Sequence, residues 1–118
     1  MENKEKFKTP EIHSQELLKI IENVKWEEGE GIEYNGTTFL LFFSDETSES
    51  DGHQDAASYQ SPSHITDFDI YLLKSLSIED KKRRLFHEIL EADLRKQGFN
   101  YNEAHDLTKV EEQKTFGK

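Results

Sequence analysis

The sequence contains no cysteine, so disulfides and thiolate metal sites are excluded, and any bound metal must be held by His, Asp, Glu or water. It also lacks an apolar run long enough to cross a bilayer, and the segment MENKEKFKTPEIH has no apolar core of a secretory signal. Basic residues are few: 15 Lys and Arg stand against 25 Asp and Glu, a formal net charge of −10. Because this charge repels phosphates and anionic membranes, we expect the protein to bind neither nucleic acid nor membranes. The missing signal and the missing apolar span lead us to expect a cytoplasmic protein.

The length of 118 residues is enough for one domain with a single core, so residues 1–118 are predicted to form one domain. Hydrophobic residues make up only 33% of the chain and charged residues 34%, which indicates that part of it is solvated. Residues 44–63, SDETSESDGHQDAASYQSPS, offer almost no core anchors and are predicted to form a mobile polar loop. Residues 114–118 are predicted to be a charged tail.

The first half of the chain predicts a helix followed by a β-hairpin. Thr9 and Pro10 suit a helix start, and an apolar stripe at helical spacing predicts a helix over 10–24. The segment GIEYNGTTFLLFF is rich in β-formers and contains Asn35-Gly36, a strong hairpin turn. We therefore expect strands at 31–34 and 37–43, and ITDFDIYLL at 65–73 predicts a further strand.

The second half of the chain predicts two helices. Ser77, with an acidic residue three positions later, resembles a capping box and opens a helix that Gly98 closes. Asn100 and Glu103 repeat the pattern and start a last helix. The order predicts a small α+β domain, in which a hairpin plus an edge strand packs against an N-terminal helix, a central helix and a C-terminal helix.

The central helix contains LFHEILEADL, in which His87 and Glu91 lie one turn and 40° apart on an ideal helix. This spacing allows both side chains to hold one ion beside the apolar face of the helix. Glu88 follows the histidine, at the position from which a carboxylate can polarise a metal-bound water. Asp93 projects into the apolar arc, where it would pair with a cation or accept a hydrogen bond from a ligand histidine.

The last helix carries a second candidate group, since His105 and Glu112 project within about 20° of each other, two turns apart. If the last two helices form a hairpin through QGFN, His105 faces His87 and Glu91. Two imidazoles, a carboxylate and a water would suit zinc. The alternative is that Glu88 and Glu91 are ordinary exposed carboxylates of a charged helix and that His105 is a surface or partly buried histidine.

The segment IYLLKSLSIEDKKRRLFHEILEADL resembles small zincin-type metallopeptidases, in which an edge strand leads into a His-Glu-x-x-His helix. The resemblance covers roughly residues 69–94, with Glu91 where those proteins have the second histidine. It implies that His87 is a zinc ligand, that Glu88 is the general base, and that His105 or else Glu112 is the third protein ligand. It also implies metal-assisted hydrolysis of a peptide or protein substrate that lies along a sheet edge at 68–72.

Two rival functions use other residues. Glu88 with Glu91, followed by Glu103 with Asp106, is similar to the magnesium-binding pattern of all-α nucleotide pyrophosphatases. A non-enzymatic acidic protein of the immunity or inhibitor type would instead bind a basic partner. Its binding surface would be formed by Asp45, Glu46, Glu49, Asp51 and Asp55.

Overall fold

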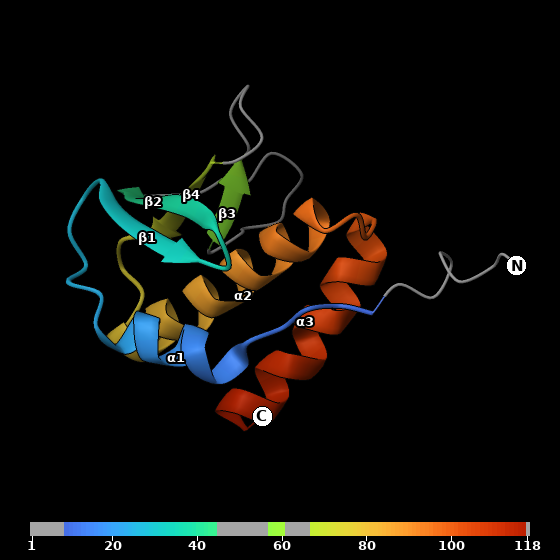
Figure 1. The fold of residues 1–118 in the computed structure, drawn as a ribbon. Coiled ribbons are helices and arrows are strands. Elements are labelled where there is room, and N and C mark those ends of the chain that lie inside the picture. Colours follow the sequence, from blue (N-terminus) through green and yellow to red (C-terminus); the bar gives the residue numbers. More distant parts are fainter. Residues whose placement is uncertain (1–8, 45–56, 61–66, 118) are drawn as a thin grey trace, which may run out of the picture.

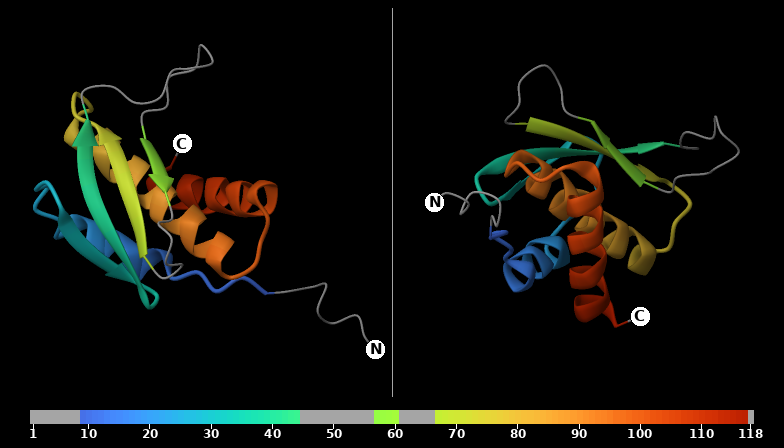
Figure 2. Two further views of the ribbon diagram at one scale, coloured as in Figure 1. Left: turned by 90° about the horizontal axis from the view of Figure 1, so that it is seen from above. Right: turned by 90° about the vertical axis from the view of Figure 1, so that its right-hand side faces the viewer.

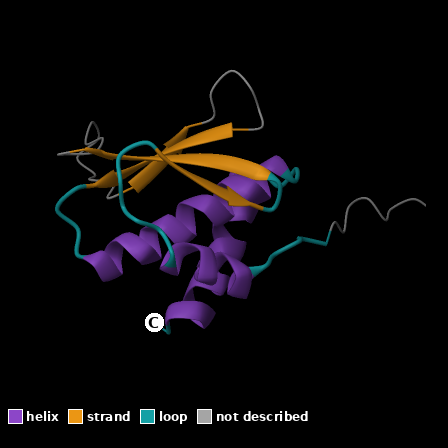
Figure 3. Ribbon diagram, turned by 60° about the vertical axis from the view of Figure 1, so that its left-hand side comes forward, coloured by secondary structure: helices purple, strands orange, loops and turns teal. Residues whose placement is uncertain are grey.

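A computed structural model describes residues 9–44, 57–60 and 67–117. They form two layers, a β-sheet on one side and three helices on the other (Figure 1, Figure 3). In chain order the elements are α1 (Ser14–Glu22), β1 (Glu30–Tyr34), β2 (Thr37–Ser44), β3 (Ala57–Gln60), β4 (Asp67–Leu73), α2 (Ile78–Lys96) and α3 (Tyr101–Phe116). The predicted α+β class is confirmed. No helix in the described part of the chain is both long and apolar enough to span a membrane.

The sheet has four strands in the order β1-β2-β4-β3. Strands β1 and β2 form the predicted antiparallel hairpin, and its turn residues Asn35 and Gly36 have φ angles of 51° and 79°. Such positive φ angles at both central positions are what an Asn-Gly hairpin turn requires. Strands β2 and β4 pair in parallel, and β3 pairs antiparallel with β4.

Two predictions about the sheet are wrong. Strand β3 lies inside residues 44–63, for which the sequence predicts a loop throughout. The prediction misses this strand because its four residues, ASYQ, are too few to show a recognisable strand pattern. Strand β4 lies between β2 and β3, so the predicted sheet edge at 68–72 does not exist. Since both neighbours of β4 pair with its backbone, an extended peptide cannot add to the sheet there.

The core lies between the sheet and the helices (Figure 2). Alternate residues of β2 and β4 point into it, as expected for a sheet with one buried face. The helix α2 crosses this face and contributes most of the helical core. The fully buried side chains include Phe39, Leu41, Ile70 and Leu72 from the sheet, Leu85, Phe86, Ile89, Leu90 and Leu94 from α2, and Leu17 and Ile21 from α1.

The first helix is shorter than predicted, because α1 begins at Ser14 and not at Pro10. Tertiary hydrogen bonds hold the preceding residues outside the helix. The side-chain amide of Gln97 accepts from the backbone N–H of Glu11 at 2.9 Å and donates to its carbonyl at 2.8 Å. The backbone N–H of His13 donates to the hydroxyl of Tyr34 at 2.9 Å.

The other helix ends follow the predicted caps. Ser77 accepts from the backbone of Asp80 at the start of α2, and Asn100 and Glu103 form a complete capping box at the start of α3. Gly98 has a φ of 108° just after α2. The predicted tail at 114–118 is wrong for residues 114–116, which are helical because the ring of Phe116 packs against the core of the domain.

Candidate metal centre

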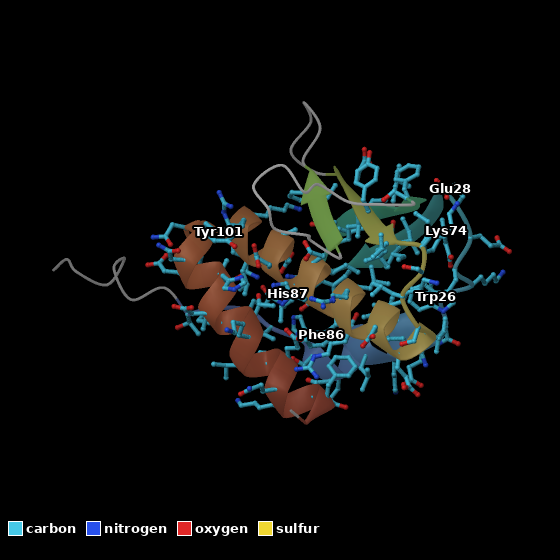
Figure 4. All side chains as sticks on the ribbon, turned by 180° about the vertical axis from the view of Figure 1, so that it is seen from behind. Trp26, Glu28, Lys74, Phe86, His87 and Tyr101 are labelled. Atoms are coloured by element: carbon cyan, nitrogen blue, oxygen red, sulfur yellow. The ribbon has the colours of Figure 1, made fainter. Side chains whose placement is uncertain are left out.

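The helices α2 and α3 form the predicted helical hairpin and bring chemically active side chains together between them. His87 lies between the two helices, as Figure 4 shows. One turn further along α2, Glu91 points to the same side. His105 reaches this place from the first half of α3. The convergence arises because the capped turn at 97–100 reverses the chain directly after α2.

A single carboxylate oxygen joins the two histidines. The ring nitrogen Nε2 of His87 lies 2.9 Å from Oε1 of Glu91, and Nδ1 of His105 lies 3.0 Å from the same oxygen. The two imidazole rings are 5.2 Å apart between centroids, in an edge-to-face arrangement. His87, Glu91 and His105 each offer one ligand atom, and these three atoms lie within 4.8 Å of one another. Among the described residues, this is the only group of three or more His, Asp or Glu side chains that converge in this way. The predicted convergence is confirmed, while metal ligation stays a prediction.

Glu112 contacts the opposite side of the His87 ring. Its Oε1 lies 2.8 Å from Nδ1 of His87, and its Oε2 accepts a hydrogen bond from Nε of Arg83. It is therefore not part of the three-residue group that His87, Glu91 and His105 form. Glu112, the predicted alternative to His105 as third ligand, thus contacts the ring of His87, and a ligand role for it stays a prediction. The sequence contained one sign of this, the shared face of His105 and Glu112, but no sign of the link to Arg83.

Burial increases from the rim of this cluster to its centre. The side chain of His105 is 33% exposed and that of His87 is 17% exposed, whereas that of Glu91 is 4% exposed. Glu91 is thus not the ordinary exposed carboxylate that a charged helix would carry. A carboxylate this deeply buried needs strong partners, and both histidines supply them.

The charges of the cluster stabilise one another. Burial lowers the pKa of His87, but its contacts with Glu112 and Glu91 outweigh burial and raise the pKa to about 9. Burial raises the pKa of Glu112, but His87 and Arg83 outweigh it and lower the pKa to about 2. The pKa of Glu91 is also lowered, since the hydrogen bonds from His87 and His105 outweigh its burial. Without metal, the cluster therefore holds a protonated His87 between two carboxylates.

Glu88, Tyr101 and Asp93 are not members of the group of three. Glu88 is half-buried, and its charge helps to raise the pKa of His87, which places it near the imidazole. Tyr101 stacks on the ring of His105 with centroids 5.4 Å apart. In the described part of the chain, Oδ2 of Asp93 accepts from the side-chain amides of Asn35 and Gln97 and not from the predicted cation or ligand histidine.

The residues of the two rival functions are placed differently. Glu103 accepts a hydrogen bond from the backbone of Asn100 at 3.0 Å in the capping box, and Asp106 is exposed. Together with Glu88 and Glu91 they form no four-carboxylate group among the residues described. The acidic residues predicted to bind a basic partner lie outside the described part of the chain. They are Asp45, Glu46, Glu49, Asp51 and Asp55.

Comparisons with known proteins add no family to this picture. The chain matches no protein-family model, and no curated protein or solved structure is detectably similar to it. The resemblance to zincin-type metallopeptidases therefore rests on the sequence at 69–94 alone.

Proposed function

We propose that this protein binds a divalent transition metal, zinc foremost, through His87, Glu91 and His105. The observation that carries the proposal is the approach of three ligand atoms to within 4.8 Å of one another, from side chains of two helices. Nitrogens of both histidines contact the same oxygen of the nearly buried Glu91. Ligands that converge on one point from separate elements are what a cation needs.

The donor types favour zinc over magnesium or calcium. Imidazole nitrogens suit zinc, copper, nickel and iron, whereas magnesium and calcium prefer oxygen ligands alone. Two histidines and one glutamate are also a ligand set of catalytic zinc sites, in which a water or substrate takes the fourth position. The 33% exposure of the His105 side chain puts the cluster within reach of solvent on that side.

The hydrogen bonds indicate which atom of His87 would bind the metal. Its Nδ1 is engaged by Glu112, so Nε2, which faces Glu91, is the nitrogen that the cation would take. The cation would replace the proton that now lies between His87 and Glu91. Metal affinity should therefore fall as the pH is lowered, because protons and metal compete for the same nitrogen.

Metal binding can be tested on untagged protein stripped with a chelator and then titrated with zinc by calorimetry. We expect one zinc per chain, and loss of this site in His87→Ala and in His105→Ala. His13→Ala is a matched control, since this histidine lies outside the cluster and its ring contacts Glu11 and Tyr34 instead. A second control replaces His53 and His64, which lie outside the described residues. Zinc binding that survives loss of His87, or no zinc binding by the wild type, contradicts the proposal.

Hydrolysis of a peptide or amide bond is a second candidate function, favoured by the position of Glu88. This residue follows His87 directly and lies close enough for its charge to raise the histidine pKa. It could therefore take a proton from a water that the metal activates. Zinc-loaded protein would be assayed on a fluorogenic peptide library. Glu88→Gln should bind zinc normally and lose turnover, whereas the control Glu79→Gln, at an exposed position of the same helix, should lose neither. No turnover by the wild type removes this candidate and leaves metal binding standing.

A further inference from the structure

We infer that Glu112, itself held by Arg83, positions His87 for the metal and is not a metal ligand. This inference rests on the proposed metal site and names the residue that controls its affinity. It assigns the carboxylate on α3 a different role from the carboxylate on α2. Glu91 faces the point where the ligand atoms meet, and Glu112 lies behind the imidazole.

His87 has a carboxylate at each of its two ring nitrogens. Nε2 is 2.9 Å from Glu91 and Nδ1 is 2.8 Å from Glu112, so the ring is held from both sides. A histidine that binds a metal is neutral and keeps one N–H. If Nε2 binds the cation, that N–H is at Nδ1 and donates to Glu112. The carboxylate therefore selects the tautomer in which the lone pair of Nε2 faces the cluster.

Both carboxylate oxygens of Glu112 already have a partner. Oε1 contacts His87, and Oε2 accepts from Nε of Arg83, which lies one turn before His87 on α2. The guanidinium group of Arg83 also lies over the ring of Phe116, 5.8 Å from its centroid. With its side chain only 16% exposed, Glu112 is fixed between two groups of α2 and directed away from the cation position.

The neighbouring Glu111 provides a matched control. It lies on the same turn of α3, is also half-buried, and accepts a hydrogen bond from the hydroxyl of Ser14 at 2.8 Å. Its hydrogen bond helps to dock α3 onto α1 but does not reach His87. A loss of affinity caused only by loosening α3 would therefore appear in Glu111→Gln as well as in Glu112→Gln.

The test compares zinc affinity, by chelator competition, and the visible spectrum of the cobalt-substituted protein. Glu112→Gln should lower zinc affinity by about 10-fold to 100-fold, the effect typical of losing a carboxylate behind a ligand histidine. Its cobalt spectrum should keep the wild-type shape, because the ligands are unchanged. Glu91→Gln should alter the spectrum, and Glu111→Gln should change neither property.

The outcomes separate this inference from the proposed function. A wild type that binds no metal overturns both. Normal zinc affinity in Glu112→Gln overturns only the inference, and a spectrum altered as in Glu91→Gln shows that Glu112 is itself a ligand. If Glu112→Gln fails to fold, Arg83→Gln answers the question, because it frees the carboxylate without touching His87. Arg83→Gln should lower the zinc affinity, as expected for Glu112→Gln. Unchanged zinc affinity in Arg83→Gln overturns the inference.

Discussion

Replacing His87 with glutamine should destabilise the metal-free protein at neutral pH and far less at alkaline pH. In the folded protein the imidazole lies between Glu112 and Glu91, 2.8 and 2.9 Å away. Its pKa there is about 9, against 6.5 for an ordinary histidine. The folded state therefore binds the proton more tightly than the unfolded state, and this difference in proton affinity contributes to stability.

The size of the effect follows from the two pKa values. A difference of about 2.5 pH units, at 1.36 kcal/mol each, corresponds to about 3 kcal/mol of unfolding free energy. Because the pKa is raised on folding, this stability is fully present below pH 6.5 and is lost as the pH rises through about 9. The lowered pKa of Glu112 describes the same ion pair from its other side, so the two effects are not added.

The assay is urea denaturation of the wild type and His87→Gln, in chelator, at pH 6.5 and at about pH 9.5. The difference in unfolding free energy between the two proteins should shrink by about 3 kcal/mol across this range. Titrating groups outside the cluster are common to both proteins and cancel in the comparison. A difference that stays constant with pH would refute the reasoning, because it would mean that His87 is not protonated in the folded cluster.

Three further substitutions test the packing around the site, each measured by urea denaturation followed by circular dichroism. Ser77→Ala should cost about 1 kcal/mol, because it removes the side-chain cap of α2. Phe86→Ala should cost about 3–5 kcal/mol, because it empties a fully buried position. Asp93→Ala should cost about 1.5–3 kcal/mol, because a carboxylate then no longer accepts from Asn35 and Gln97. A loss below about 0.5 kcal/mol, as at ordinary surface positions, would contradict each of these assignments.

The parts of the fold that the sequence predicts correctly are those whose backbone conformation or hydrogen bonds depend only on residues a few positions away. Asn35 and Gly36 adopt the turn themselves, and Ser77 and Asn100 cap helices through N–H groups three positions away. Such local interactions do not depend on the rest of the chain. The amino-terminal residues behave differently: Thr9 and Pro10 fit a helix start, yet the extended segment gains hydrogen bonds to a residue 86 positions away.

The place of β4 in the sheet and the candidate metal centre were predictable to different degrees. The alternation at 65–73 indicates a strand but not its neighbours, so the central place of β4 depends on the parallel pairing with β2. The helical period puts His87 and Glu91 on one face, and the capped turn predicts that α3 folds back on α2. Sequence could not show which nitrogen of His87 each carboxylate contacts, since that depends on the rotation of α3 about its own axis.

Glu91 stands where the His-Glu-x-x-His pattern has its second histidine. In that pattern one helix carries two histidines; here it carries His87 and Glu91, and α3 supplies the second imidazole from His105. The proposed ligand set is therefore two histidines and one glutamate, which is also a ligand set of catalytic zinc sites. Because Glu91 lies between the two imidazoles, its negative charge can balance the positive charge of a protonated imidazole when no metal is bound. A histidine at this position would supply no negative charge and would leave a protonated His87 with one carboxylate partner fewer.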